Sequence, residues 1–249
     1  MRIRLLAAAL AMATAVPAYA ADAVVEDVVV VDGAYDWSGV YVGVFGGWAH
    51  SRTKATDITG EEYGGATPGA QLSINDDGFT LGATLGYNFQ SGSWVFGPEA
   101  ELGWVSNDKT YTDPNDDDDG LFTEYGFFGS VTGRVGYAAD RTLFYGKGGV
   151  AFATMKNAGG EFDGVGNEDS DGKWGFDGNE AGFGDETRVG WTIGAGIEHA
   201  FTDQWTVKAE YMFADFGGET YGHVDGSMDE PFSFDNQLHT VKIGLNYQF

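Results

Sequence analysis

The chain ends in the stretch His239-Thr-Val-Lys-Ile-Gly-Leu-Asn-Tyr-Gln-Phe249, in which apolar and polar positions alternate strictly. The apolar face carries Val241, Ile243, Leu245, Tyr247 and Phe249. A run of about ten residues with a period of two is typical of a strand that crosses a bilayer, with lipid on one face and a polar interior on the other. The same run is too polar for a membrane helix. An edge strand of a soluble sandwich alternates in the same way, so the rest of the chain must decide.

The first 20 residues have the pattern of a secretory signal peptide. Arg2 and Arg4 precede an apolar stretch over 5–16, and the small residues of Ala18-Tyr19-Ala20 follow it. This pattern predicts export and cleavage after the tripeptide. No later segment has the roughly 20 apolar residues that a spanning helix needs. We therefore expect residues 1–20 to be removed and the exported chain to have no helical anchor.

Composition excludes several classes of protein. There are no cysteines among 249 residues, so no disulfide framework, thiolate metal site or cysteine nucleophile can form. Glycine is abundant at 40 residues and aromatic residues make up 15% of the chain, which suits many closely packed strands. The formal net charge is −25, and loss of Arg2 and Arg4 makes it −27. A nucleic-acid partner is excluded because it requires a basic face.

Eight alternating or nearly alternating runs divide the chain. They cover residues 39–51, 79–90, 94–106, 124–139, 142–157, 187–201, 205–217 and 234–249. Each is long enough for the roughly 9–11 tilted residues that cross a hydrocarbon core.

The connections between these runs alternate in length. Three are tiny, at 91–93, 140–141 and 202–204, and four are long, at 52–78, 107–123, 158–186 and 218–233. Short periplasmic turns alternating with long external loops are typical of outer-membrane barrels. We therefore predict, over residues 37–249, an all-β fold: an eight-stranded antiparallel transmembrane up-and-down β-barrel with both termini on the periplasmic side. One alternative stays open, a ten-stranded barrel with a further hairpin in 158–186.

Charge follows the same division. The four long loops have net charges of −3, −5, −8 and −4, and the segment 21–36 has −5. These segments account for −25 of the −27, so the strands and short turns are nearly neutral. We expect long acidic extracellular loops and an acidic N-terminal periplasmic segment over 21–36. The sequence leaves open whether this segment is a free tail or packs beneath the barrel.

Six of the seven tryptophans fall near predicted strand ends. Trp37, Trp94 and Trp205 lie toward the short turns, and Trp48, Trp104 and Trp191 lie toward the long loops. Indole rings collect at the two interfaces of a membrane protein. The distribution therefore predicts two interfacial belts.

Charged residues opposite the apolar faces define a predicted lumen. They are four acids and four bases, Glu99, Glu101, Arg134, Lys147, Glu198, Lys208, Glu210 and Lys242. Two hypotheses compete: ion pairs that fill and neutralise the lumen, or a selectivity filter for small solutes. Eight strands enclose an interior just wide enough for side chains, which favours the filled lumen.

Two acidic loops resemble half of a calcium-binding loop, at 113–120 and 167–172. The carboxylate that closes such a loop is missing in both, because Gly126 and Gly178 stand at that position. We interpret both as solvated acidic loops and expect no metal or cofactor. Weak divalent binding would involve Asp117, Asp119, Asp169 and Asp171.

The histidines do not form a catalytic pattern with the serines near them in sequence. The residues concerned are His50, His199, His223 and His239, with Ser51, Ser227 and Ser233. A hydrolase needs a nucleophile, a base and an orienting acid within hydrogen-bond reach, and no spacing here predicts that. His50 and His239 are expected to approach each other because the first and last strands must pair. We therefore predict no enzymatic activity.

The two ends of the predicted barrel carry a family resemblance. Trp37-Ser-Gly-Val-Tyr-Val-Gly43, followed by Gly46 and Gly47 after an Ala/Asp/Val-rich segment, resembles the alphaproteobacterial 25/31-kDa outer-membrane protein ("porin family") group of the OmpA-type barrel superfamily. The terminal run to Phe249 looks like the signal that the barrel-assembly machinery reads in such proteins. The resemblance covers nearly the whole exported chain and is weakest in the acidic loops. It implies an eight-stranded barrel in the outer membrane and supplies no catalytic residues.

These observations predict a structural, surface-exposed outer-membrane protein that contributes to envelope integrity. Its expected partners are outer-membrane lipid, lipopolysaccharide and the assembly machinery; host or surface ligands are not identified. Two alternatives remain at this stage: a passive porin-like channel for ions or small solutes, and a divalent-dependent adhesin acting through the acidic loops.

Overall fold

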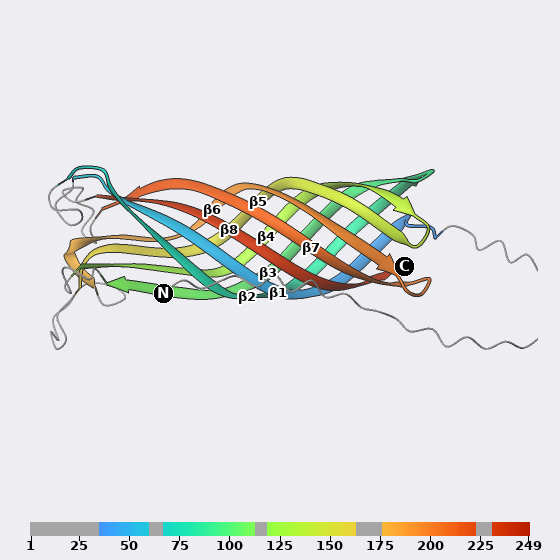
Figure 1. Cartoon of the computed structure of the whole chain (residues 1–249), viewed down its shortest axis with the longest axis horizontal. Helices are drawn as coiled ribbons and strands as arrows, with labels where there is room; N and C mark the ends of the chain where they lie inside the picture. Colours follow the sequence, from blue (N-terminus) through green and yellow to red (C-terminus); the bar gives the residue numbers. More distant parts are fainter. Residues whose placement is uncertain (1–34, 60–66, 113–118, 163–175, 223–230) are drawn as a thin grey trace, which may run out of the picture. The chain divides into compact units, whose positions relative to one another are not determined.

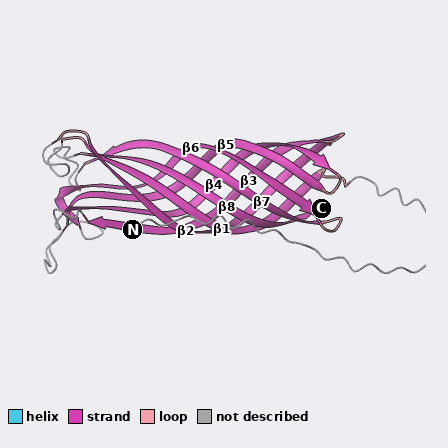
Figure 2. Cartoon of the chain, viewed as in Figure 1, coloured by secondary structure: helices cyan, strands magenta, loops and turns pink. Residues whose placement is uncertain are grey.

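Eight antiparallel strands follow one another around a closed barrel in the computed structural model, which describes residues 35–59, 67–112, 119–162, 176–222 and 231–249 (Figures 1 and 2). The strands are β1 (Gly39–Asp57), β2 (Ala70–Ser91), β3 (Trp94–Thr112), β4 (Asp119–Ala139), β5 (Thr142–Phe162), β6 (Phe176–Ala200), β7 (Trp205–Tyr221) and β8 (Phe232–Gln248). The predicted eight-stranded fold is confirmed. The described residues contain no helix long and apolar enough to cross a membrane.

The terminal stretch closes the barrel. β8 pairs with β1 from Tyr41↔Gln248 to Asp57↔Phe232. The backbone N–H of Phe249 donates to the carbonyl oxygen of Val40 at 3.0 Å. A closed sheet leaves no free edge at membrane depth, where an unpaired backbone group costs several kcal/mol.

The three short connections lie at one end of the barrel, which we call the turn end, and the chain's last strand also finishes there (Figure 1). The opposite end, which we call the loop end, carries the connections after β1, β3, β5 and β7. On the turn-end half of the barrel the outward residues are apolar and half exposed. They include Val42, Leu81, Phe96, Val131, Phe144, Ile193, Val207 and Ile243. Alternation therefore places an apolar belt on the outside of the wall.

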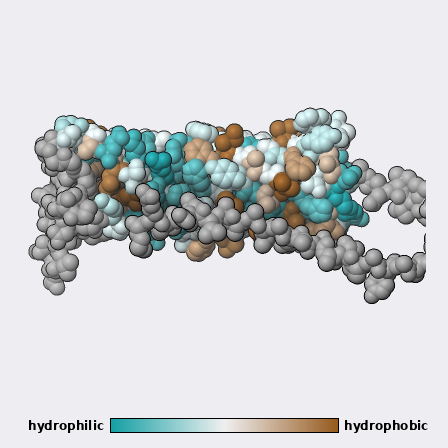
Figure 3. Space-filling model, in the orientation of Figure 1, coloured by the Kyte–Doolittle hydropathy of each residue, from teal (hydrophilic) through white to brown (hydrophobic). Residues whose placement is uncertain are grey.

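The strands run well past this belt, which corrects the predicted loop boundaries. The expected loop at 52–78 shortens to the connection after Asp57, and the other three long connections shorten in the same way. In these extensions the outward residues are polar, such as Arg52, Asn75 and Asp108. A polar outer face hides a strand from a search for membrane-crossing runs. Figure 3 shows hydrophilic residues covering much of the loop-end half of the viewed face.

Two ladders stop before the loop end. The β2–β3 ladder ends at Phe79↔Ser106, and the β6–β7 ladder ends at Trp191↔Asp215. Beyond these pairs the barrel continues as two four-stranded sheets, β7-β8-β1-β2 and β3-β4-β5-β6. A buried apolar cluster contains residues of both sheets: Ala55, Ile74, Phe232 and Phe234 from the first and Leu121 from the second.

Candidate functional site: a closed lumen with a buried charge network

All eight charged residues that the alternation placed in the lumen lie inside the barrel. They come from β3 to β8, and the exposed fraction of each is 4% or less. We call this set the charge layer: Glu99, Glu101, Arg134, Lys147, Glu198, Lys208, Glu210 and Lys242. Four carboxylates and four cations are therefore removed from water together. Removal of ions from water is costly unless the charges are closely paired.

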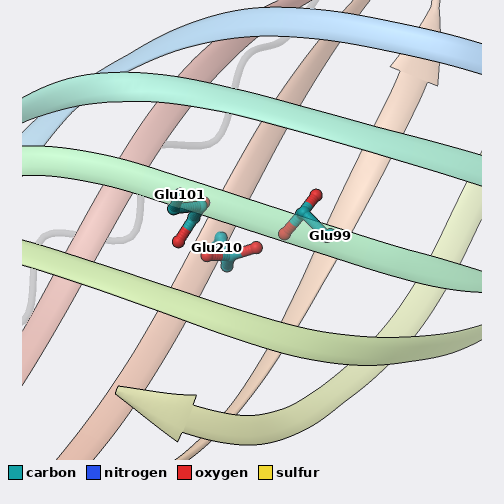
Figure 4. Close-up of side chains that lie close together, drawn as sticks. All are labelled: Glu99, Glu101 and Glu210. Atoms are coloured by element: carbon teal, nitrogen blue, oxygen red, sulfur yellow. The ribbon is translucent and has the colours of Figure 1, made fainter. Parts of the chain in front are cut away.

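Three carboxylates and three ammonium groups form the centre of the charge layer. Figure 4 shows Glu99 and Glu101 on one strand with Glu210 beside them, their carboxyl groups gathered in one place. Lys147 Nζ lies 2.8 Å from Glu99 Oε1, 3.1 Å from Glu101 Oε2 and 2.8 Å from Glu210 Oε1. Lys147 therefore contacts all three carboxylates.

Two more lysines complete this centre. Lys242 Nζ lies 2.6 Å from Glu101 Oε2 and 2.9 Å from Glu210 Oε1. Lys208 Nζ lies 3.2 Å from Glu101 Oε1 and 3.5 Å from Glu99 Oε2. Each carboxylate thus has at least two ammonium neighbours, and the network is balanced in charge.

Arg134 extends the network toward the turn end. Its guanidinium contacts Glu198 Oε2 at 2.9 Å and Glu99 Oε2 at 3.3 Å. It also lies over the ring of Tyr145, 4.5 Å from the ring centre. The hydroxyl of Tyr41 donates to Glu99 at 2.8 Å, and Tyr145 donates to Glu210 at 2.8 Å.

The carboxylates of Glu99, Glu101 and Glu210 each offer an oxygen within 4.8 Å of the others, a spacing that a metal ion could use. The surrounding lysines do not fit that interpretation. Lys147, Lys208 and Lys242 already supply three positive charges at these oxygens. An added divalent ion would meet three ammonium groups within a few ångströms, which is strongly repulsive in a dry interior.

The turn end of the lumen is closed by residues that precede β1. Tyr35 and Trp37 are buried against Val95, Leu143 and Tyr145, in a cluster that we call the turn-end plug. Its remaining members are Ala138 and Ala200. The placement of Trp37 corrects the predicted interfacial belt: its exposed fraction is 1%, so it fills the barrel mouth instead of facing lipid.

Hydrogen bonds hold the turn-end plug in place. The N–H of Trp37 donates to Gln90 Oε1 at 2.7 Å, and the hydroxyl of Tyr35 donates to Gln248 Oε1 at 3.2 Å. Gln248 Nε2 donates in turn to the carbonyl oxygens of Asp36 and Ser38, each at 2.9 Å. Burial raises the pKa of the Tyr35 hydroxyl to about 12, and the Glu198 carboxylate adds to the increase. The last residues of the segment 21–36 therefore pack against the barrel.

The loop side of the charge layer is closed by packed side chains. An apolar cluster lies there, formed by Ala49, Val105, Tyr125, Phe128, Ala151, Ala153, Met155, Met212, Ala214, Phe216 and Leu238. A hydrogen-bonded polar group follows, in which Thr53 donates to Asn236 at 2.9 Å and Thr123 donates to Asn157 at 3.1 Å. The charge layer thus lies between two apolar layers.

The other predicted belt tryptophans lie on the outer surface. The exposed fractions of Trp48, Trp94, Trp104, Trp191 and Trp205 range from 39% to 57%. In the terminal strand Val241, Ile243, Leu245 and Phe249 are exposed, and Tyr247 is half-buried. Of the weak calcium candidates, Asp117, Asp169 and Asp171 lie outside the described residues, as does the side chain of Asp119.

The first and last strands bring two histidines together, as expected. His50 and His239 are register partners with ring centres 6.1 Å apart. His50 Nδ1 lies 2.6 Å from Asp77 Oδ1, whereas the neighbouring Ser51 hydroxyl is buried in the interior and accepts from Asn107. The side chains of His50 and Ser51 therefore face opposite sides of the barrel wall. His223 and Ser227 lie outside the described residues.

The sequence did not single out several residues that complete the closed lumen. Tyr41 and Tyr145 belong to the inward faces of their strands, so alternation alone could have found them. Gly86 makes room for one of them, because a Cβ there would collide with the Tyr41 ring. No pattern in the sequence pointed to Gln90 and Gln248, because their hydrogen bonds form only when the residues before β1 fold back into the barrel mouth.

An apolar belt outside, a filled interior and a sheet that closes on itself within that belt together define a small outer-membrane β-barrel protein. The chain matches the outer membrane protein beta-barrel domain family over residues 6–249 and belongs to that family. Proteins of this kind reside in the outer membrane, which is where its relatives are found.

The predicted resemblance to the 25/31-kDa group is confirmed by two relatives. The chain is 31% identical to the 31 kDa outer-membrane immunogenic protein of Brucella melitensis over 255 residues, covering 97% of this chain and 98% of that protein. It is 29% identical to the 25 kDa outer-membrane immunogenic protein of Brucella abortus over 241 residues, covering 93% and 91%. The crystal structure of OprG from Pseudomonas aeruginosa has a similar fold, with a TM-score of 0.53, 14% identity and coverage of 88% of this chain and 98% of that one.

Proposed function

We propose that this protein is a structural, non-enzymatic outer-membrane barrel that contributes to envelope integrity and exposes its loop end at the cell surface. The supporting observation is the buried charge layer between two apolar layers. In this proposal the packed lumen carries no continuous water path, and the protein's role lies in its wall and its surface. In this proposal the turn end faces the periplasm, and the apolar belt contacts outer-membrane lipid and lipopolysaccharide.

The closed lumen leads to a direct electrical test. Purified protein in a planar bilayer is expected to show no stable conductance, because ions would have to displace packed residues at both ends of the charge layer. A steady open level that disappears when Lys208 or Glu210 is replaced would instead support the porin-like channel.

In the cell, deletion of the gene is expected to increase sensitivity to detergents and bile salts. Unchanged sensitivity would contradict the envelope role.

The N-terminal region is proposed to be a signal peptide that is removed during export. Mass spectrometry of the protein extracted from outer membranes is expected to give a chain that begins at Ala21. A chain that begins at Met1 in the same fraction would contradict cleavage.

We further propose that the barrel-assembly machinery recognises the terminal strand through Val241, Ile243, Leu245, Tyr247 and Phe249.

A further inference from the structure

The two sheets beyond the membrane belt meet along two seams, and the seams differ. One seam lies between β6 and β7. Here Arg188 Nη1 contacts Glu219 Oε2 at 2.6 Å, and its Nη2 donates to the carbonyl oxygens of Phe216 and Gly218 at 3.3 and 3.0 Å. The hydroxyl of Tyr221 also donates to Glu186 Oε1 at 2.7 Å. Side chains therefore bridge this seam and occupy backbone acceptors along it.

The second seam lies between β2 and β3, and we call it the open seam. Its edges are residues 70–78 of β2 and 107–112 of β3, which pair only with β1 and β4 respectively. Among the described residues, no side-chain hydrogen bond or ion pair within 4.0 Å crosses this seam, and the interaction across it is the longer-range attraction between Asp76 of β2 and Lys109 of β3. Asn107, at its base, donates to Ser51 of β1 instead. The two edges therefore present backbone groups without ladder partners, and such edges are templates for the addition of another strand.

The side chains along the open seam define what an added strand must carry. Toward the interior, Leu72 and Tyr111 pack against the apolar cluster that contains Ile74. Toward the outside, Asp108 is an exposed acid, and Asp77 is exposed and contacts His50 Nδ1 at 2.6 Å. Directly opposed side chains of neighbouring strands interact, and opposite charges across a pair are favourable. The matching strand is therefore apolar where it faces the cluster with Leu72 and Tyr111, and basic on its outer face.

A hollow beside the open seam, over β3 and its neighbour β4, offers a place for a basic side chain. It has a volume of about 340 Å³, and its lining includes Trp104, Asp108, Phe122 and Glu124. An aromatic ring beside a carboxylate suits a lysine or arginine side chain, because both groups attract a cation. Glu124 is already paired with Lys156 at 3.1 Å, so Asp108 is the acid that an incoming base would meet.

We propose that the open seam binds an extended polypeptide of alternating apolar and basic residues by strand addition. Main-chain hydrogen bonds to β2 or β3 would supply affinity, and the alternating side chains would supply specificity. This inference goes beyond the envelope role. It requires the loop end to be accessible, but it does not depend on whether loss of the protein weakens the envelope.

The test uses the full exported chain in detergent micelles or lipid nanodiscs, with a short capped peptide of alternating lysine and valine as the probe. Hydrogen–deuterium exchange by mass spectrometry is expected to slow severalfold at 70–78 and 107–112 when the peptide is added. Exchange at 186–190 and 216–221, beside the bridged seam, is expected to stay unchanged. The same peptide N-methylated at every residue cannot donate backbone hydrogen bonds and is expected to give no protection.

Matched variants separate strand addition from general attraction between a basic peptide and an acidic protein. Replacing Asp77 and Asp108 together with Asn is expected to weaken peptide binding about tenfold, because the outer face of the open seam then loses both of its exposed carboxylates. Asp185→Asn removes an exposed acid on β6, away from the open seam, and is expected to leave binding unchanged. Equal weakening by all these changes, binding without protection at the open seam, or no binding would each overturn the proposal. None of these outcomes bears on the detergent sensitivity of a deletion strain.

Discussion

Replacing Lys147 with methionine is expected to lower the free energy of unfolding by about 3–5 kcal/mol, the range for breaking a buried ion pair from one side. Lys147 Nζ contacts Glu99, Glu101 and Glu210 within 3.1 Å, and its side chain has no exposed surface. Methionine fills a similar volume but leaves three carboxylates with one cation fewer. Guanidinium titration of the refolded barrel, followed by tryptophan fluorescence, measures the change.

A second lysine on the barrel provides the control. Lys156 contacts Glu124 at 3.1 Å on the outside of the strand extension, and both side chains are about one-third exposed. Lys156→Met is therefore expected to cost at most about 1 kcal/mol, as surface pairs generally do. Adding Glu210→Gln to the Lys147→Met variant is expected to restore part of the lost stability, because it rebalances the charge. Equal losses from the two lysine variants would contradict an interdependent charge layer.

Alternation in the sequence was sufficient to predict most of the wall. In β8 every second residue from Val241 faces outward, and Lys242 faces inward. A one-residue shift in register would exchange the two faces, so the alternation fixes which residues face the lumen. The same argument placed charged residues of six strands inside the barrel. It could not give their partners, since which carboxylate contacts Lys147 depends on the stagger of strands that are distant in the sequence.

The strand extensions were missed because their pattern is the reverse of the pattern in the membrane belt. In the membrane belt the apolar residues face outward, whereas beyond it Ala55, Ile74 and Phe234 face the interior and the outward residues are polar. A search for membrane-crossing strands counts such segments as acidic loops. Reading each of them separately for a buried apolar face would have identified a water-exposed sheet that continues from the barrel.

Trp37 shows that the position of a tryptophan in the sequence does not determine whether its ring faces lipid. Near the end of a strand, an indole is consistent with an interfacial ring, and five other tryptophans are exposed on the outer surface. Trp37 precedes β1 and is held by Gln90 from another strand. Sequence alone did not predict that interaction, because it requires the chain to fold back into the barrel mouth.

Replacing Trp37 with alanine is expected to lower the free energy of unfolding by about 3–5 kcal/mol, as for other large buried aromatic residues. The ring is 1% exposed and packs edge-on against Tyr35, with ring centres 4.8 Å apart. Its removal leaves a cavity in the turn-end plug and weakens the contact that holds residues before β1. Denaturant titration in micelles gives the stability change.

Trp94→Ala is the matched control, because Trp94 is 57% exposed at the same end of the barrel. In detergent, the stability lost in Trp94→Ala is expected to be clearly smaller than that lost in Trp37→Ala, and equal losses would contradict a packed plug.

Planar-bilayer recordings of Trp37→Ala then separate the two barriers in the lumen, the turn-end plug and the charge layer. Because the charge layer still lies between the plug and the loop side, the variant is expected to remain non-conducting. Stable conductance in Trp37→Ala would mean that the turn-end plug alone keeps the barrel closed, and that the paired charges behind it permit ions to pass.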